Sequence, residues 1–258
     1  MVAQPVLTPK GENLKFLKAS EVNDAWGVNM LVYGSPGVGK TTFAASAQDS
    51  PYGKDVLFID VEGGVRSISD RADITIFRPD DFDDIRKVFL MLKNGELSAF
   101  KTVVVDSIGE TQALGLRSIM KTSKTPDLPG LQDYGKSNEQ VGNLIRGLRG
   151  LAQSKGVNVI ITALAVESKD ETTGAVLTRP ALTPKALELA TGAVDMLGYL
   201  SQTKDGTRVL NFAPSPSYMA KLRQPVSGAQ IPLRIENPSL VDILAAMRTA
   251  HPGKAGTD

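Results

Sequence analysis

The chain contains no cysteine, a single histidine and few aromatic residues, which make up 5% of its 258 residues. Without cysteine the protein has no disulfide, no thiolate metal site and no cysteine nucleophile, which fits a reducing compartment. The lone histidine, His251, lies beside Pro252 near the C-terminus. Because a metal site needs several ligands, a solvated tail is the favoured interpretation of this residue.

A strong charge of one sign is also absent, since 29 basic and 28 acidic side chains leave a net charge of +1. A protein that coats duplex DNA through bulk charge carries a basic excess, so any nucleic-acid surface here must be local. No apolar run reaches the roughly 18 residues of a membrane-spanning helix, and Met1–Gly11 lacks the apolar stretch of a secretory signal. We therefore expect a soluble, cytoplasmic protein without a membrane partner.

What the chain does contain is ordinary globular composition, with 41% hydrophobic and 22% charged residues. Short apolar runs rich in β-branched residues alternate with stretches of helical periodicity. This alternation predicts an α/β fold with a mostly parallel central sheet flanked by helices. The expected strands are Asn29–Tyr33, Val56–Val61, Ile74–Phe77, Thr102–Val105 and Val157–Ile161.

The pattern changes in the last quarter of the chain. Val194–Ser201 and Arg208–Phe212 are expected strands joined by the turn sequence Lys204-Asp205-Gly206, which predicts a C-terminal β-hairpin. An amphipathic helix is expected around Leu240–Met247. The expected domains are an N-terminal segment (1–27), a core domain (28–225) and a C-terminal helix with a flexible tail (226–258).

A phosphate-binding motif follows the first expected strand. Residues 34–41 satisfy the pattern G-x-x-x-x-G-K-[ST], with a strand before it and a helix after it. Its glycines let several N–H groups converge on one phosphate oxygen, and the helix N-terminus adds positive potential. We expect Lys40 to bridge the β- and γ-phosphates of ATP and Thr41 to complete the coordination of Mg²⁺. The expected nucleotide-binding residues are Gly34, Ser35, Pro36, Gly37, Val38, Gly39, Lys40, Thr41 and Thr42.

Acidic residues follow other expected strands. Asp106 ends the run Thr102–Val105 and is the expected metal partner of Thr41, with a helix cap as the alternative. Asp60 and Glu62 lie at the end of the expected strand that follows the helix after the phosphate-binding loop (P-loop). Their spacing puts both on one side of an extended chain. We expect Glu62 to act as catalytic base or to orient the attacking water, with a salt bridge or turn hydrogen bond as the alternative.

In this order the motifs resemble the core of RecA-type recombinases. The stretch from Leu31 to Arg223 resembles phage ATP-binding proteins that are core-only RecA relatives of the single-strand annealing or recombination type. Besides the P-loop, the resemblance includes Asp60-Val61-Glu62-Gly63-Gly64, Phe77-Arg78-Pro79-Asp80, Val103-Val104-Val105-Asp106-Ser107, Asp133-Tyr134-Gly135, Val159-Ile160-Ile161-Thr162-Ala163, Lys169-Asp170 and Lys221-Leu222-Arg223.

The resemblance implies ATP held between neighbouring subunits of a ring or filament, with single-stranded DNA near loops on the inner surface. It implies a location in the host cytoplasm if the protein is phage-encoded, and a single-strand-binding protein as a further partner. Lys221 and Arg223 resemble a basic pair that stabilises the γ-phosphate of an adjacent subunit, although solvated basic residues are the alternative. Leu164 departs from the family pattern, because recombinase cores place a polar sensor there and leucine cannot form that hydrogen bond.

Two long polar stretches, 121–136 and 167–185, are expected to be loops, and loops of such length are often functional. Tyr134 is their only aromatic residue, so a stacking platform for bases is poorly developed, and acidic residues dilute the positive charge. The basic residues available to a DNA backbone are Lys121, Lys124, Lys136, Lys169, Arg179 and Lys185.

Three functions are compatible with these motifs. The leading hypothesis is a DNA-dependent ATPase that acts on single-stranded DNA in phage-type recombination or annealing. Leu164 motivates an alternative, an ATP-dependent assembly switch or partner adaptor with little turnover. A small-molecule P-loop kinase ranks lowest, because no arginine-rich lid is evident and Glu62 suits water activation better.

Overall fold

A computed structural model describes residues 27–121, 123, 128–169, 174–224 and 230–250, together with the short antiparallel strands β1 (Val6–Leu7) and β2 (Asn13–Leu14). At the centre of the main sheet, β3 (Asn29–Gly34) runs parallel to β7 (Asn158–Lys169) on one side and β9 (Met196–Gln202) on the other. The order across the sheet is β12-β10-β9-β3-β7-β6-β4-β5, with β11 beside β9 and β8 beside β7.

The other strands are β4 (Val56–Asp60), β5 (Thr75–Phe77), β6 (Thr102–Asp106), β8 (Val176–Pro180), β10 (Arg208–Asn211), β11 (Lys221–Leu222) and β12 (Arg234–Glu236). The helices are α1 (Lys40–Ala45), α2 (Phe82–Asn94), α3 (Ile108–Met120), α4 (Leu131–Lys155), α5 (Pro184–Ala193) and α6 (Leu240–Ala250), with 3₁₀ turns η2 (Ser46–Asp49) and η3 (Gly64–Ile68). Within the described part of the chain, no helix has the length and apolar character to cross a membrane.

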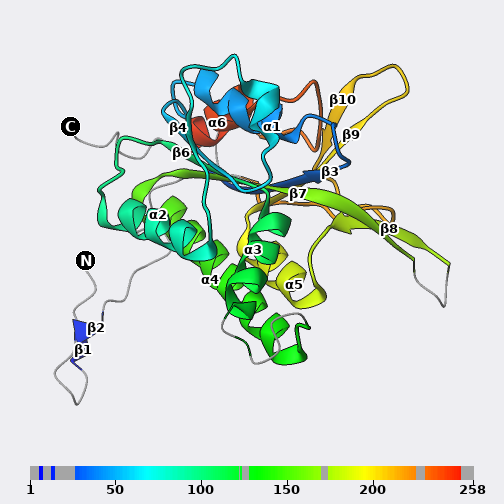
Figure 1. Cartoon of the computed structure of the whole chain (residues 1–258). Helices are drawn as coiled ribbons and strands as arrows, with labels where there is room; N and C mark the ends of the chain where they lie inside the picture. The colour runs from blue at the N-terminus through cyan, green and yellow to red at the C-terminus, as the bar shows by residue number, and fades with distance from the viewer. Residues whose placement is uncertain are drawn as a thin grey trace.

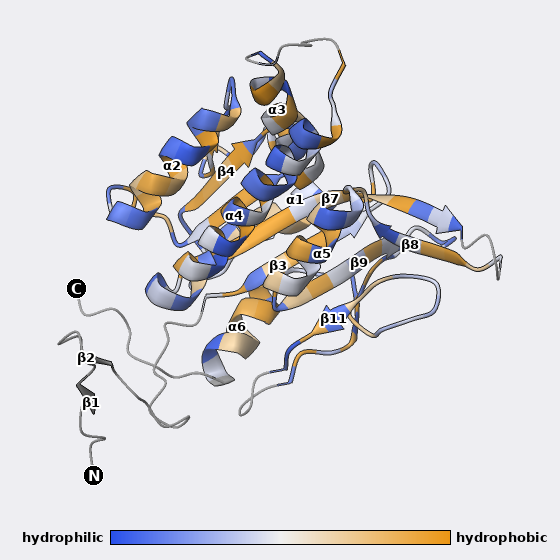
Figure 2. Cartoon of the chain, turned by 90° about the horizontal axis from the view of Figure 1, so that it is seen from below, coloured by the Kyte–Doolittle hydropathy of each residue, from blue (hydrophilic) through white to orange (hydrophobic). Residues whose placement is uncertain are grey.

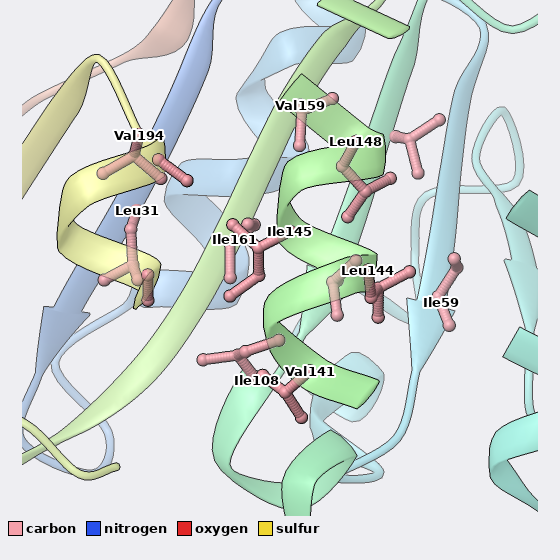
Figure 3. Packing of buried hydrophobic residues seen from close by; sticks show 14 of the residues in the cluster. Leu31, Ile59, Ile108, Val141, Leu144, Ile145, Leu148, Val159, Ile161 and Val194 are labelled. Atoms are coloured by element: carbon pink, nitrogen blue, oxygen red, sulfur yellow. The ribbon is translucent and has the colours of Figure 1, made fainter. Parts of the chain in front are cut away.

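The central strands are buried on both faces, which explains their continuous apolar sequences. In β3, Leu31 and Tyr33 belong to one core while Met30 and Val32 belong to the opposite one, as a side-chain period of two requires. Helices α2 to α5 cover the first face, and α1 and α6 cover the second (Figure 1). Figure 3 shows the first core, where apolar residues of α4 pack against the sheet.

The hydropathy of the elements follows this layering. The central strands are mainly hydrophobic, whereas α2 and α4 also carry polar residues (Figure 2). α2 begins where the Asp81 side chain accepts a hydrogen bond of 3.1 Å from the Asp84 N–H, and it ends at Gly95 with φ of 87°. Both signals are typical of helix ends.

The predicted fold class is confirmed. The structure has a mostly parallel sheet flanked by helices, and the C-terminal hairpin is formed by the antiparallel strands β9 and β10. Each expected strand is present, although β7 extends well beyond the expected Val157–Ile161. The proposed domain limits at 27 and 225 remain predictions.

The expectation of long loops is wrong for much of both stretches. β7 continues to Lys169 and pairs with β8 in an antiparallel ribbon that projects beyond the body of the sheet (Figure 1). Val166 and Val176 on this ribbon are 38% and 46% exposed, whereas Pro180 at the end of β8 is buried, so the ribbon is only partly covered and its sequence lacks the long apolar run of the central strands. Similarly, α4 begins at Leu131, which is 92% exposed, because the first turn of that helix extends into solvent.

Candidate nucleotide site

The phosphate loop connects β3 to α1. It lies at the C-terminal end of β3, a central strand of the sheet. Gly39 has φ of 101°, a conformation that residues with a side chain rarely adopt. Gly34 is required for another reason, because a Cβ at this position would lie 2.2 Å from the backbone oxygen of Leu200 in β9. The loop therefore depends on glycine both for its own curvature and for the close approach of β9.

Lys40 is buried in the loop that it follows. Its ammonium group donates hydrogen bonds of 3.0 Å and 2.9 Å to the backbone oxygens of Gly34 and Ser35. Burial lowers the pKa of Lys40, while the nearby carboxylates of Glu62 and Asp106 act in the opposite direction. The ammonium group thus sits on the phosphate loop, close to the two acidic groups singled out in the sequence.

Asp106 lies at the end of β6 and is buried. Its carboxylate accepts a hydrogen bond of 2.7 Å from the Thr41 hydroxyl and one of 2.5 Å from the Thr162 hydroxyl in β7. Burial raises the pKa of this carboxyl, and the hydrogen bonds from the two hydroxyl groups partly offset that rise. Three separate segments of the chain therefore meet at one carboxylate.

The donor set at Thr41 and Asp106 fits Mg²⁺. Hydroxyl and carboxylate oxygens are hard ligands, and Mg²⁺ in phosphate sites is usually held by one or two protein groups together with phosphates and water. A Cβ added to Gly64 would lie 3.3 Å from both the Thr41 hydroxyl oxygen and the Asp106 carboxylate, so this glycine keeps the space beside the oxygen pair clear. The residues present therefore suit magnesium bound with a nucleotide.

The expectation that Asp60 and Glu62 share one side of a strand is wrong, because β4 ends at Asp60. The Asp60 side chain is fully buried, accepts hydrogen bonds from the Gly63 and Gly64 N–H groups, and pairs with Arg78 at 3.0 Å. Asp60 thus holds the turn that follows β4. Glu62 lies on that turn and is exposed.

The turn that carries Glu62 is tied to β6, the strand that ends at Asp106. The N–H groups of Val61 and Glu62 both donate to the backbone oxygen of Asp106, at 2.8 Å and 3.1 Å. The Glu62 carboxylate is close enough to influence the pKa of both Lys40 and Asp106. Backbone hydrogen bonds therefore place this exposed carboxylate beside the phosphate loop.

Lys221 and Arg223 lie elsewhere in the fold. Lys221 in β11 donates hydrogen bonds of 2.9 Å and 2.6 Å to the backbone oxygens of Thr191 and Val194, and burial lowers its pKa. Arg223 pairs with Asp195 at 2.7 Å. Because β11 pairs with the first residues of β9, this pair is remote from the phosphate loop of its own chain. Their role at a neighbouring subunit remains a prediction.

The basic residues expected to follow DNA are scattered. Lys185 pairs with Glu188, and Arg179 donates to the backbone oxygens of Pro180 and Leu182. Lys121, Lys136 and Lys169 are placed in the described part of the chain, whereas Lys124 lies outside the described residues. Their DNA-binding role remains a prediction.

Leu164 lies opposite Gly34 in the parallel register of β3 and β7, and its backbone oxygen accepts a hydrogen bond from the Ala181 N–H. A sensor residue is expected at the end of its strand. β7 instead continues past Leu164 into the ribbon with β8. The nearest polar side chain before it in β7 is Thr162, which is bonded to Asp106.

Sequence reasoning missed Arg208, at the start of β10. A Cβ added to Gly39 would lie 2.9 Å from both Cζ and Nε of Arg208, so this side chain lies against the phosphate loop. The only available signal was its place directly after the hairpin turn. That signal carries no information on which loop the hairpin approaches.

Comparisons with known proteins give one family match and similar solved structures. Residues 27–224 match the family described as AAA domain. A comparison with curated proteins gives no significant match. Among solved structures, the crystal structure of the RadB recombinase is similar, with 24% sequence identity and a TM-score of 0.45 over 73% of this chain and 81% of that chain. Because the family match spans most of the chain, from the phosphate-loop strand to β11, the chain belongs to the AAA domain family of P-loop ATPases.

Proposed function

We propose that the protein binds ATP with Mg²⁺ at residues 34–42 and hydrolyses it while assembled on single-stranded DNA, in recombination or annealing of the phage type. The observation that carries the catalytic part is the convergence of Lys40, Thr41 and Glu62 around the Asp106 carboxylate. Magnesium, when bound with ATP, neutralises charge on the β- and γ-phosphates.

Each residue has a distinct role in this proposal. The N–H groups of the phosphate loop and the Lys40 ammonium group bind the phosphates, while Thr41 and Asp106 hold the metal. Thr162 orients the Asp106 carboxylate through its hydrogen bond. Glu62, exposed and fixed by its backbone, accepts a proton from the attacking water or orients it.

Replacing Glu62 by glutamine is expected to lower kcat by about 10²- to 10⁴-fold, the usual contribution of a general base, with little change in KM. Glutamine keeps the size of the side chain but cannot accept the proton. Steady-state ATPase assays measure this effect. Glu96→Gln, on the exposed surface after α2, is the matched control and should behave as the wild type.

The DNA part of the proposal rests on the resemblance of the motifs to recombinase cores and on the projecting β7–β8 ribbon with Lys169 near its tip. It includes self-association as a ring or filament, a cytoplasmic location and a single-strand-binding protein as a partner. Positive charge from Lys221 and Arg223 would then reach the γ-phosphate of a neighbouring subunit.

Single-stranded DNA is expected to increase ATP turnover, and electron microscopy of the same mixtures should show rings or filaments. The Lys40→Ala variant is the control, since it removes the phosphate contact. If the wild type binds no single-stranded DNA with or without ATP, the DNA part of the proposal has to be abandoned. Turnover without DNA binding would leave the ATPase part standing alone.

The position of Leu164 favours a second candidate, an ATP-dependent assembly switch with little turnover. An apolar side chain opposite Gly34 cannot report the loss of the γ-phosphate through a hydrogen bond. In that case Glu62→Gln leaves biological function nearly unchanged, whereas Lys40→Ala abolishes it. Equal phenotypes for these two variants would rule against the switch.

A further inference from the structure

Arg208 has a fixed backbone beside the phosphate loop. It pairs with Gln202 across the β9–β10 hairpin, and its backbone oxygen accepts a hydrogen bond of 2.7 Å from the Asn237 N–H. Two residues before Gln202 in β9, the backbone oxygen of Leu200 packs against Gly34. The β9–β10 hairpin therefore lies against the phosphate loop at two of the loop's glycines, Gly34 and Gly39.

The guanidinium group of Arg208 is available to a ligand. The side chain is exposed, and among the described residues no carboxylate forms an ion pair with it. Arg234, in the neighbouring strand β12, is different because it pairs with Glu236. A positive charge held against a phosphate loop without a carboxylate partner is suited to binding an anion.

The sheet order indicates which part of a nucleotide Arg208 faces. Asp106 in β6 and Glu62 after β4 lie on one side of β3, beyond β7, whereas β9 and β10 lie on the other side. Asp106 and Thr41 would hold a metal bound with the β- and γ-phosphates, so the γ-phosphate would lie on the side of Asp106 and Glu62. The α-phosphate and the nucleoside would then lie toward β9 and β10, where Arg208 is placed.

We propose that Arg208 binds the α-phosphate end of the nucleotide held by its own chain, so that it contributes equally to the binding of ATP and ADP. This inference rests on the proposed function, because it requires a nucleotide at residues 34–42. It assigns to the β9–β10 hairpin a binding role distinct from the metal and water chemistry on the opposite side of the loop.

The test is equilibrium titration of fluorescent ATP and ADP analogues into the full chain carrying Arg208→Met or Arg208→Gln. Loss of a hydrogen bond to a charged group is expected to weaken binding of both nucleotides by about 10- to 100-fold, by the same factor for each. Arg234→Met, with its guanidinium group engaged by Glu236, is the matched control and should bind as the wild type.

Distinct outcomes separate this inference from the proposed function. Unchanged affinity in a folded Arg208 variant overturns the inference alone, and so does weaker binding of ATP with unchanged binding of ADP, which would place Arg208 at the γ-phosphate. A wild type that binds neither nucleotide overturns both proposals. Thermal unfolding of each variant verifies its fold, and Arg208→Gln decides the question if Arg208→Met fails to fold.

Discussion

Replacing Asp106 by asparagine is expected to lower ATP hydrolysis by about 10²- to 10³-fold, because the proposed magnesium site would lose its anionic ligand and with it several kcal/mol of charge stabilisation. In the same variant, the free energy of unfolding without nucleotide is expected to rise at neutral pH. The cause is the burial of the carboxyl, which raises its pKa and makes the charged form costly. The Thr162 hydroxyl can rotate to accept from the new amide.

The pH dependence checks the sign of this effect. A carboxyl whose pKa is raised on folding contributes its full stability below the unfolded value of 3.8, and loses it as the pH rises through the folded value. The advantage of Asp106→Asn over the wild type should therefore grow from pH 4 to pH 7 in urea unfolding experiments. Asp70→Asn, at an exposed position, serves as control. A variant that is less stable than the wild type at every pH would contradict the argument.

Replacing Lys40 by alanine is expected to reduce ATP turnover by about 10²- to 10³-fold, the cost of removing one preorganised group that stabilises charge in the transition state. Nucleotide affinity should fall as well, since in the proposed function the same ammonium group would also contact the phosphates in the ground state. Steady-state ATPase assays and titration with a fluorescent ATP analogue measure the two effects separately.

The fold of Lys40→Ala should survive. The substitution removes hydrogen bonds to the Gly34 and Ser35 oxygens, but it also removes a buried charge whose pKa is lowered by desolvation. Lys54→Ala, an exposed position after η2, is the matched control. Normal turnover by Lys40→Ala would mean that hydrolysis occurs elsewhere, or that a contaminating ATPase is present.

The phosphate loop and the strands around it were predictable because their signals are local. The motif at residues 34–41 and the β-branched runs of β3, β4 and β6 each depend on adjacent residues, and burial on both faces reinforces the pattern. The same holds for the caps of α2 at Asp81 and Gly95.

The rest of the site depends on contacts that no local pattern carries. Gly63 adopts the left-handed conformation with φ of 79°, so the chain turns after Asp60 and the period-2 expectation for Glu62 no longer applies. The Thr162 bond to Asp106 and the approach of Arg208 to Gly39 join strands that are distant in sequence. The β7–β8 ribbon was missed because many of its side chains are exposed or only half-buried, so its sequence shows neither a continuous apolar run nor a regular alternation.

The central place of β3 also determines when during synthesis the site can form. Its neighbours in the sheet come late in the chain, and the Val28 N–H donates to the Asn158 side chain across 130 residues of sequence. A growing chain that has emerged only as far as α3 carries the whole phosphate-binding sequence but neither strand that flanks it. Pairing over such distances is slow, because loop closure precedes any gain from contact. The strands that flank the phosphate loop are therefore in place only after the chain has been made as far as the β9–β10 hairpin, whose Leu200 lies against Gly34.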